Sequence, residues 1–196
     1  MAVVSLKYKS KQGTLTAPGD VDPGAMIPIA TTTLSTSTAD ITFSNIPGVY
    51  EHLQIRGITF GTAAPSGSML FQMNSDTSSN YRSHLLGGNG SVATGYGNPS
   101  AETSGRFYGY YDNLSNTSFP LVFIMDILDY SNTNKYKTVR TLSGMDKNGA
   151  NYGEVFLYSS FWMSTSAVTS IKLFCGGQNL GNNTQFALYG IKRAGA

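Results

Sequence analysis

The pattern of short strand-forming runs constrains the fold of this chain more than any other feature. From Met26 onward, β-branched and aromatic residues gather in short runs that Gly, Pro, Asn, Asp and Ser separate. No stretch longer than about ten residues has the 3.6-residue period of an amphipathic helix. Runs of this kind are typical of β-strands. We predict strands over 26–34, 39–43, 50–60, 68–74, 119–130, 135–145, 154–162, 170–175 and 185–192.

Two of these runs indicate how their strands are buried. The run 50–60 alternates, with Leu53 and Ile55 on one face and polar side chains on the other, which predicts a half-buried strand. The run 119–130 is apolar on both faces for most of its length. That pattern is typical of a strand in the centre of a sheet with both faces covered.

The middle of the chain is less regular. The sequence NYRSHLLGG at 80–88 permits at most one helical turn, and the Gly-rich stretch 87–105 predicts a long surface excursion. About nine or ten strands, with turn signals every 8 to 15 residues, predict an all-β fold. We therefore expect an antiparallel two-sheet β-sandwich over 26–196, of jelly-roll type.

The first 25 residues differ from the rest, because they hold three lysines, two prolines and three glycines and lack apolar periodicity after Leu6. A solvating tail is one interpretation of this segment. The other is an extended arm that orders against a neighbouring subunit, and the apolar cluster near its start favours it. The predicted assembly residues are Val3, Val4, Leu6, Lys7, Tyr8, Lys9 and Lys11.

Composition limits the classes of partner. Only 12% of residues are charged, whereas 23 Ser, 20 Thr and 14 Asn supply small polar side chains. The net charge of +2 is too small for a protein that wraps nucleic acid, and no apolar run is long enough for a membrane-spanning helix. Cys175 is the single cysteine, so no internal disulfide can form. We expect Cys175 to be a small buried apolar side chain.

Catalytic and metal-binding patterns are weak. The sequence has no G-x-S-x-G elbow, H-E-x-x-H motif, phosphate loop or dinucleotide fingerprint, which predicts a protein that is not an enzyme and has no cofactor. His52 and His84 have no second ligand type nearby in sequence. Asp126 and Asp129 point to opposite faces of a strand, so a structural role is favoured for Asp126. The pair Asn74 and Asp76 lacks the ligand spacing of a calcium loop, and no metal site is predicted.

Tyrosines set among Gly, Ser and Asn are more suggestive. Tyr96 lies in such a segment, and on a strand Arg106, Tyr108 and Tyr110 would line one face. Tyrosine offers a rigid contact area and a hydroxyl, while Ser, Gly and Asn add adaptable hydrogen bonds, as in binding surfaces without strong charge. The four residues are candidates for contact with a glycan or other receptor. The alternative is that these rings fill the core or cover a sheet edge.

Several phrases of the sequence resemble small virion proteins of tailed bacteriophages that infect aquatic bacteria. They are AVVSLKYKSKQG near the start, YEHLQIRG, FQMNSDTSSNYRSH, DILDYSNTNKYKT and the ending FALYGIK. The resemblance covers most of the chain and is weakest in the Gly-rich middle. It implies a β-sandwich that assembles in symmetric copies on a phage particle, and it brings no active site with it.

The expected function is therefore that of a virion structural protein, most simply a tail-fibre or appendage module. Its arm would attach to identical subunits or other virion proteins, with a trimer as the first expectation, and its sandwich would contact host-surface glycan. A capsid decoration protein that clamps coat subunits is the main alternative, and a glycan depolymerase is a further one. The resemblance implies a location on the virion, after synthesis in the host cytoplasm.

Overall fold

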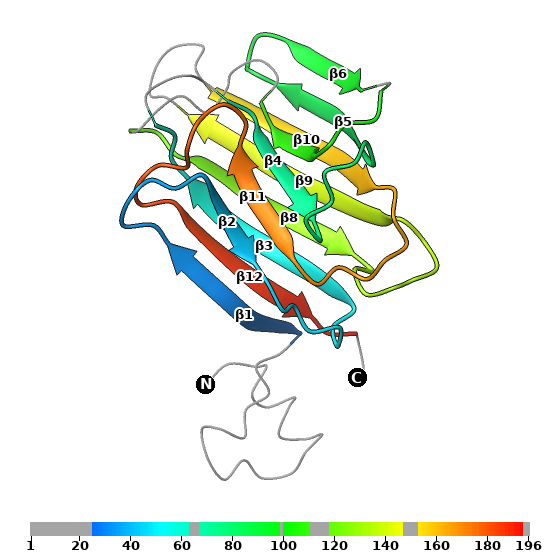
Figure 1. The fold of residues 1–196 in the computed structure, drawn as a ribbon. Coiled ribbons are helices and arrows are strands. Elements are labelled where there is room, and N and C mark those ends of the chain that lie inside the picture. Colours follow the sequence, from blue (N-terminus) through cyan, green and yellow to red (C-terminus); the bar gives the residue numbers. More distant parts are fainter. Residues whose placement is uncertain (1–24, 63–66, 99, 110–117, 147–152, 194–196) are drawn as a thin grey trace, which may run out of the picture.

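The computed structural model describes residues 25–62, 67–98, 100–109, 118–146 and 153–193. These residues form twelve strands in two antiparallel sheets (Figure 1). No helix occurs among them, and none of their segments could therefore cross a membrane as a helix. The predicted all-β sandwich is thus confirmed. The arm predicted for residues 1–25 lies outside the described residues except for Ala25.

The larger sheet has eight strands, which follow one another across the sheet in an order different from that of the chain. From edge to edge they are β1 (Met26–Thr33), β12 (Gln185–Ile191), β3 (His52–Thr59), β8 (Leu121–Leu128), β9 (Lys137–Asp146), β10 (Gly153–Trp162), β5 (Tyr81–Gly88) and β6 (Ala93–Gly97). The smaller sheet contains β2 (Asp40–Phe43), β11 (Ile171–Cys175), β4 (Met69–Met73) and β7 (Gly105–Tyr108).

The pairing of these strands is that of a jelly roll. Eight strands pair as if one long hairpin had been rolled up: β1 with β12, β2 with β11, β3 with β8 and β4 with β7. The remaining strands form two added hairpins. The β9–β10 hairpin extends the larger sheet beyond β8, and the β5–β6 hairpin pairs with β10 and forms its far end (Figure 1).

The core lies between the two sheets and is rich in aromatic residues. The predicted alternation of the run 50–60 is confirmed, because Leu53 and Ile55 are fully buried on the inner face of β3. Beside them, Phe123 and Phe186 pack edge to face with ring centroids 5.4 Å apart. Gly57 makes room for these rings, since a Cβ atom there would lie 2.3 Å from the Phe123 ring.

Two sequence expectations about the strands are wrong, and one strand was not predicted. The segment 80–88, for which at most one helical turn was expected, contains β5, whose inner residues are buried. The stretch 87–105 is not a pure excursion, because residues 93–97 form β6 and pair with β5. The central strand β8 is buried on one face only: Val122 is 49% exposed and Ile124 is 38% exposed on the other. Within the described part of the chain, only the inner face of β8 is covered.

Candidate functional site

Strands β5, β6 and β7 surround a pocket of about 310 Å³ at one end of the sandwich. Strand β7 is the last strand of the smaller sheet, whereas the larger sheet continues beyond it with β6. The inner face of β6 is therefore not covered by a strand, and the pocket opens there. Its lining consists of Ser83, Leu85, Tyr96, Asn98, Glu102, Arg106, Gly109 and Tyr158.

Tyr96 supplies an aromatic wall of this pocket. It lies opposite Leu85 in the β5–β6 pairing, so its side chain lies on the inner face of the sheet. Its ring is 47% exposed, while Leu85 below it is buried. The backbone N–H of Asn98 donates to the carbonyl of Ser83 at 3.0 Å, which fixes the end of β6 against β5. An exposed aromatic ring on a fixed strand is suited to contact a ligand.

Arg106 supplies the positive charge of the pocket in a fixed position. Its Nη1 atom donates to the Ser68 hydroxyl at 2.8 Å and to the Gly109 carbonyl at 3.2 Å. Its Nη2 atom lies 3.6 Å from the Glu102 carboxylate. Glu102 is held in turn by a two-way backbone bridge to Tyr81 at the start of β5. The guanidinium and the carboxylate are thus positioned before any ligand arrives.

Tyr158 gives the pocket a buried hydroxyl. The side chain is 1% exposed, and its hydroxyl has no hydrogen-bond partner among the residues that the structure describes. Burial raises the pKa of Tyr158, so the group stays protonated and can donate a hydrogen bond. A buried polar atom without a partner is costly, and a ligand group that accepts from it would remove that cost.

The structure places the four candidate contact residues differently. Tyr96 and Arg106 line the same pocket. Tyr108 does not, because the register between β4 and β7 shifts beside it, which turns it into the core with no exposed surface. Its hydroxyl contacts Glu154, and Phe156 packs against its ring. The expectation that Tyr108 faces a ligand is therefore wrong, and Tyr110 lies outside the described residues.

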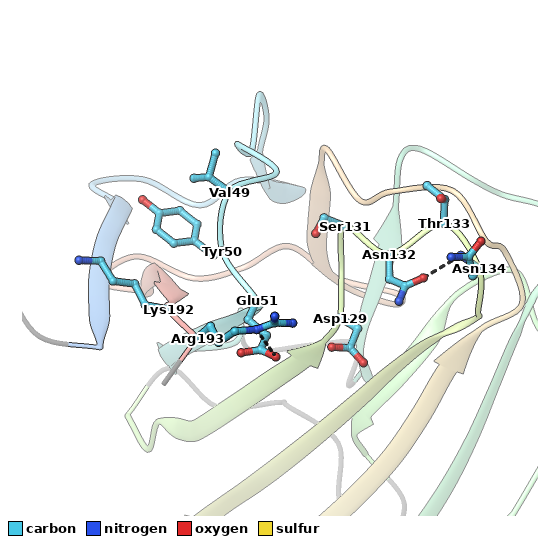
Figure 2. Close-up of a pocket in the computed structure, with 10 residues that line it drawn as sticks. All are labelled: Val49, Tyr50, Glu51, Asp129, Ser131, Asn132, Thr133, Asn134, Lys192 and Arg193. Atoms are coloured by element: carbon cyan, nitrogen blue, oxygen red, sulfur yellow. Dashed lines mark hydrogen bonds and ion pairs between the residues drawn. The ribbon is translucent and has the colours of Figure 1, made fainter. Parts of the chain in front are cut away.

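A second and larger pocket, of about 740 Å³, lies where the loops before β3 and after β8 meet the end of β12 (Figure 2). Figure 2 shows Val49 and Tyr50 on one side, with Asn132 and Asn134 on the other. Two carboxylates, those of Glu51 and Asp129, line the pocket as well. Sequence reasoning missed this pocket, because its residues come from separate turns.

Both carboxylates of this second pocket are paired with cationic side chains. Arg193 lies 3.5 Å from the Glu51 carboxylate, and Lys135 contacts the Asp129 carboxylate. The hydrogen bond from Lys135 lowers the pKa of Asp129. His52 accepts a hydrogen bond from the Asp129 backbone N–H at 3.0 Å. Although oxygen and nitrogen atoms of Glu51, His52 and Asp129 lie within 4.8 Å of one another, the cluster is accounted for as an ion-pair network.

Other polar residues singled out from the sequence have structural contacts. The Asp126 carboxylate accepts from Gln54 at 2.7 Å, which confirms a hydrogen-bonding role. The Asn74 side chain bridges to the segment before β11, accepting from the Thr169 backbone N–H at 2.8 Å. Cys175 is buried, as predicted, and burial raises its pKa to about 11.

Comparison with known proteins does not assign a function to either pocket. No protein-family model matches the chain, and a search of curated proteins found no similar sequence.

Proposed function

We propose that this chain is a structural protein of a bacteriophage virion, and that it forms an appendage or tail-fibre module that contacts glycans on the host surface. The virion assignment is supported by the sequence phrases that resemble phage proteins. The jelly roll is compatible with it, because this fold occurs in viral capsid and lectin domains. A fold alone does not define a function, so the glycan assignment rests on the pocket around Tyr96 and Arg106.

The single observation that carries the glycan assignment is the combination of groups in that pocket. The exposed Tyr96 ring suits the apolar face of a sugar ring. The fixed Arg106 guanidinium donates to hydroxyl oxygens, the Glu102 carboxylate accepts from hydroxyl groups, and the Tyr158 hydroxyl is a further donor. A volume of about 310 Å³ is at the lower end of the range for ligand pockets, so one or two sugar rings fit.

The proposal includes no hydrolytic step. Glycoside hydrolysis uses two carboxyl groups across the scissile bond, and the acid needs a raised pKa. Among the described residues, Glu102 is the only carboxylate that lines the pocket around Tyr96, and it lies 3.6 Å from the Arg106 guanidinium. A single carboxylate paired with a cation favours binding over cleavage. Fragmentation of host envelope polysaccharide by the purified protein would overturn the non-enzymatic part of the proposal.

Capsid decoration is the second candidate. It is favoured by the exposed apolar side chains on the outer face of the larger sheet, which offer an area for protein contact. A decoration protein would use that face to clamp coat subunits, and the Tyr96 pocket would then have no receptor to bind.

The test of the glycan assignment compares two tyrosines. Tyr96→Ala removes the aromatic wall of the pocket, whereas Tyr136→Ala removes a tyrosine that is 55% exposed elsewhere. We expect Tyr96→Ala to weaken binding to polysaccharide extracted from the host envelope about tenfold, since the loss of an aromatic stacking surface costs about 1–3 kcal/mol where the stacked group is a nucleic-acid base. Tyr136→Ala should bind as the wild type does. Equal binding by all three proteins, or none by the wild type, would contradict the glycan assignment.

A further inference from the structure

The outer face of the larger sheet carries a group of exposed apolar side chains. They are 38% to 62% exposed and come from four neighbouring strands, β8, β9, β10 and β5. We call this group the outer patch, and it consists of Leu86, Val122, Ile124, Leu142, Val155 and Leu157. A soluble protein commonly exposes single apolar residues, but a contiguous group of this kind marks an interaction site.

The strand register makes the outer patch continuous. Ile124 lies opposite Leu142, Leu142 opposite Leu157, and Leu157 opposite Leu86, so one apolar row crosses all four strands. In the next row, Gly144 lies between Val122 and Val155. Side chains that are directly opposite in antiparallel strands lie about 5 Å apart. The outer patch therefore presents one apolar surface and not a set of isolated residues.

The outer patch includes the outer apolar residues of β8, Val122 and Ile124. A strand that is apolar on both faces is typical of a position with both faces buried. Strand β8 is central in the sheet, yet Val122 and Ile124 are 49% and 38% exposed among the residues that the structure describes. A partner on the outer patch would give β8 the environment that its sequence indicates.

The shape of the patch fits a second copy of the same chain. Gly144 has no side chain, and around it lies a hollow of about 330 Å³ whose lining includes Val122, Ile124, Leu142 and Val155. Leu86, the most exposed member at 62%, lies two strands away on the same face. The face thus holds both a projection and a hollow, so two identical faces can each fill the other, as self-complementary interfaces require.

The area and the charges around the patch agree with this occupant. Six half-exposed aliphatic side chains give an apolar area on the order of 500 Å² per copy, so two copies bury about 1,000 Å² before any rim is counted, near the lower bound of stable interfaces. Two residues beyond Ile124, toward the C-terminal end of β8, Asp126 lies opposite Arg140. A rim with both signs side by side can pair with its own copy without like-charge repulsion.

We propose that a second copy of this chain packs on the outer patch through apolar contacts centred on Leu142 and Leu157. This proposal depends on the proposed function in one respect, because both assume that the protein works as an assembly of identical copies. The glycan pocket lies on the inner side of the sheet, so the two proposals concern different surfaces.

The experiment is a mass measurement in solution by sedimentation equilibrium on the full chain between about 1 and 100 μM. Val155→Glu places a charge in the outer patch, and the matched control Val92→Glu places the same charge in the β5–β6 turn. Both valines are 54% exposed, so the substitutions start from equal exposure. We expect the wild type and Val92→Glu to form oligomers, and Val155→Glu to self-associate at least about tenfold more weakly because a buried interface excludes an unpaired charge.

A monomeric wild type at 100 μM would overturn the proposal, as would an unchanged oligomer of Val155→Glu with a native circular dichroism spectrum. Binding of the monomeric wild type to vesicles of zwitterionic phospholipid would instead identify a lipid surface as the occupant and refute the second copy. Polysaccharide binding, measured on the same proteins, separates the two proposals. Val155→Glu should still bind polysaccharide through Tyr96, whereas normal assembly without such binding would refute the glycan assignment alone.

Discussion

Lys137 offers the sharpest test of how this fold is held together. It is a lysine with no exposed surface at the start of β9. Its Nζ atom donates to three backbone carbonyls: Asn132 at 2.5 Å, Lys135 at 2.9 Å and Thr165 at 3.1 Å. These contacts join the loop after β8 to the segment after β10. Because Asn132 lines the larger pocket, Lys137 also supports the shape of that pocket.

The substitution Lys137→Met keeps the aliphatic stem and removes the ammonium group. A hydrogen bond to a charged donor contributes about 1.5–3 kcal/mol to the free energy of unfolding, before the cost of burying the charge is subtracted. In the variant, three carbonyls would lose their shared donor. Burial lowers the pKa of Lys137, so the cost of desolvating the charge cancels part of this contribution. We expect a net loss of about 2–4 kcal/mol in the free energy of unfolding.

Urea unfolding followed by tryptophan fluorescence measures this change, since Trp162 is buried at the end of β10. Lys172 on the smaller sheet is partly exposed, with its Nζ atom 4.9 Å from the centroid of the Phe174 ring. The control substitution Lys172→Met should change the unfolding free energy by less than about 1 kcal/mol. A loss below about 1 kcal/mol for Lys137→Met, with an unchanged m-value, would refute the reasoning that the three carbonyls depend on this ammonium group.

Three other predictions concern separate regions. For Asp76, burial raises the pKa but hydrogen bonds from Asn80, Trp162 and Ser78 outweigh it and hold the pKa at about 2. The lowered pKa should therefore add about 1–2 kcal/mol to the free energy of unfolding above pH 3.8, and this contribution should be lost as the pH falls through 2. The substitution Asp76→Asn should abolish this pH dependence, which acid unfolding curves measure. Tyr158→Phe should leave the melting temperature unchanged or raise it, because the hydroxyl has no partner among the described residues. The same substitution should weaken polysaccharide binding. A large drop in melting temperature would contradict this prediction. Deletion of residues 1–25 should leave a folded sandwich that no longer joins the particle, and normal incorporation would contradict the arm hypothesis.

The sequence was most informative where a strand has one buried face. The alternation around Leu53 and Ile55 predicted both the strand and its orientation, because water on one side and the core on the other impose a period of two. It was least informative for β5 and β6. Glycines weaken the alternation there, and the pairing of these strands depends on β10, which is distant in sequence. The jelly-roll class and the strands of the β9–β10 hairpin could be predicted, but the β5–β6 hairpin and the places of both hairpins in the sheet could not.

Site prediction was limited by the same long-range geometry. Tyr96 and Arg106 were named as candidates because they lie among Gly, Ser and Asn, a composition that is typical of binding surfaces without strong charge. Tyr108 was misplaced because a register shift beside it breaks the expected alternation of side chains. The Tyr158 hydroxyl gave no sequence signal, because only the packed structure shows that it lacks a partner. The apolar outer face of β8 was visible in the sequence, although its exposure was not.

The location of the protein on the phage particle tests the central proposal most directly. Antibodies raised against the folded sandwich, bound to intact particles and imaged by electron microscopy, would give that location. The proposed appendage role predicts label at the tail or its fibres in a small, fixed number of positions. Label spread over the head with the spacing of the coat lattice would contradict it and would favour the decoration role.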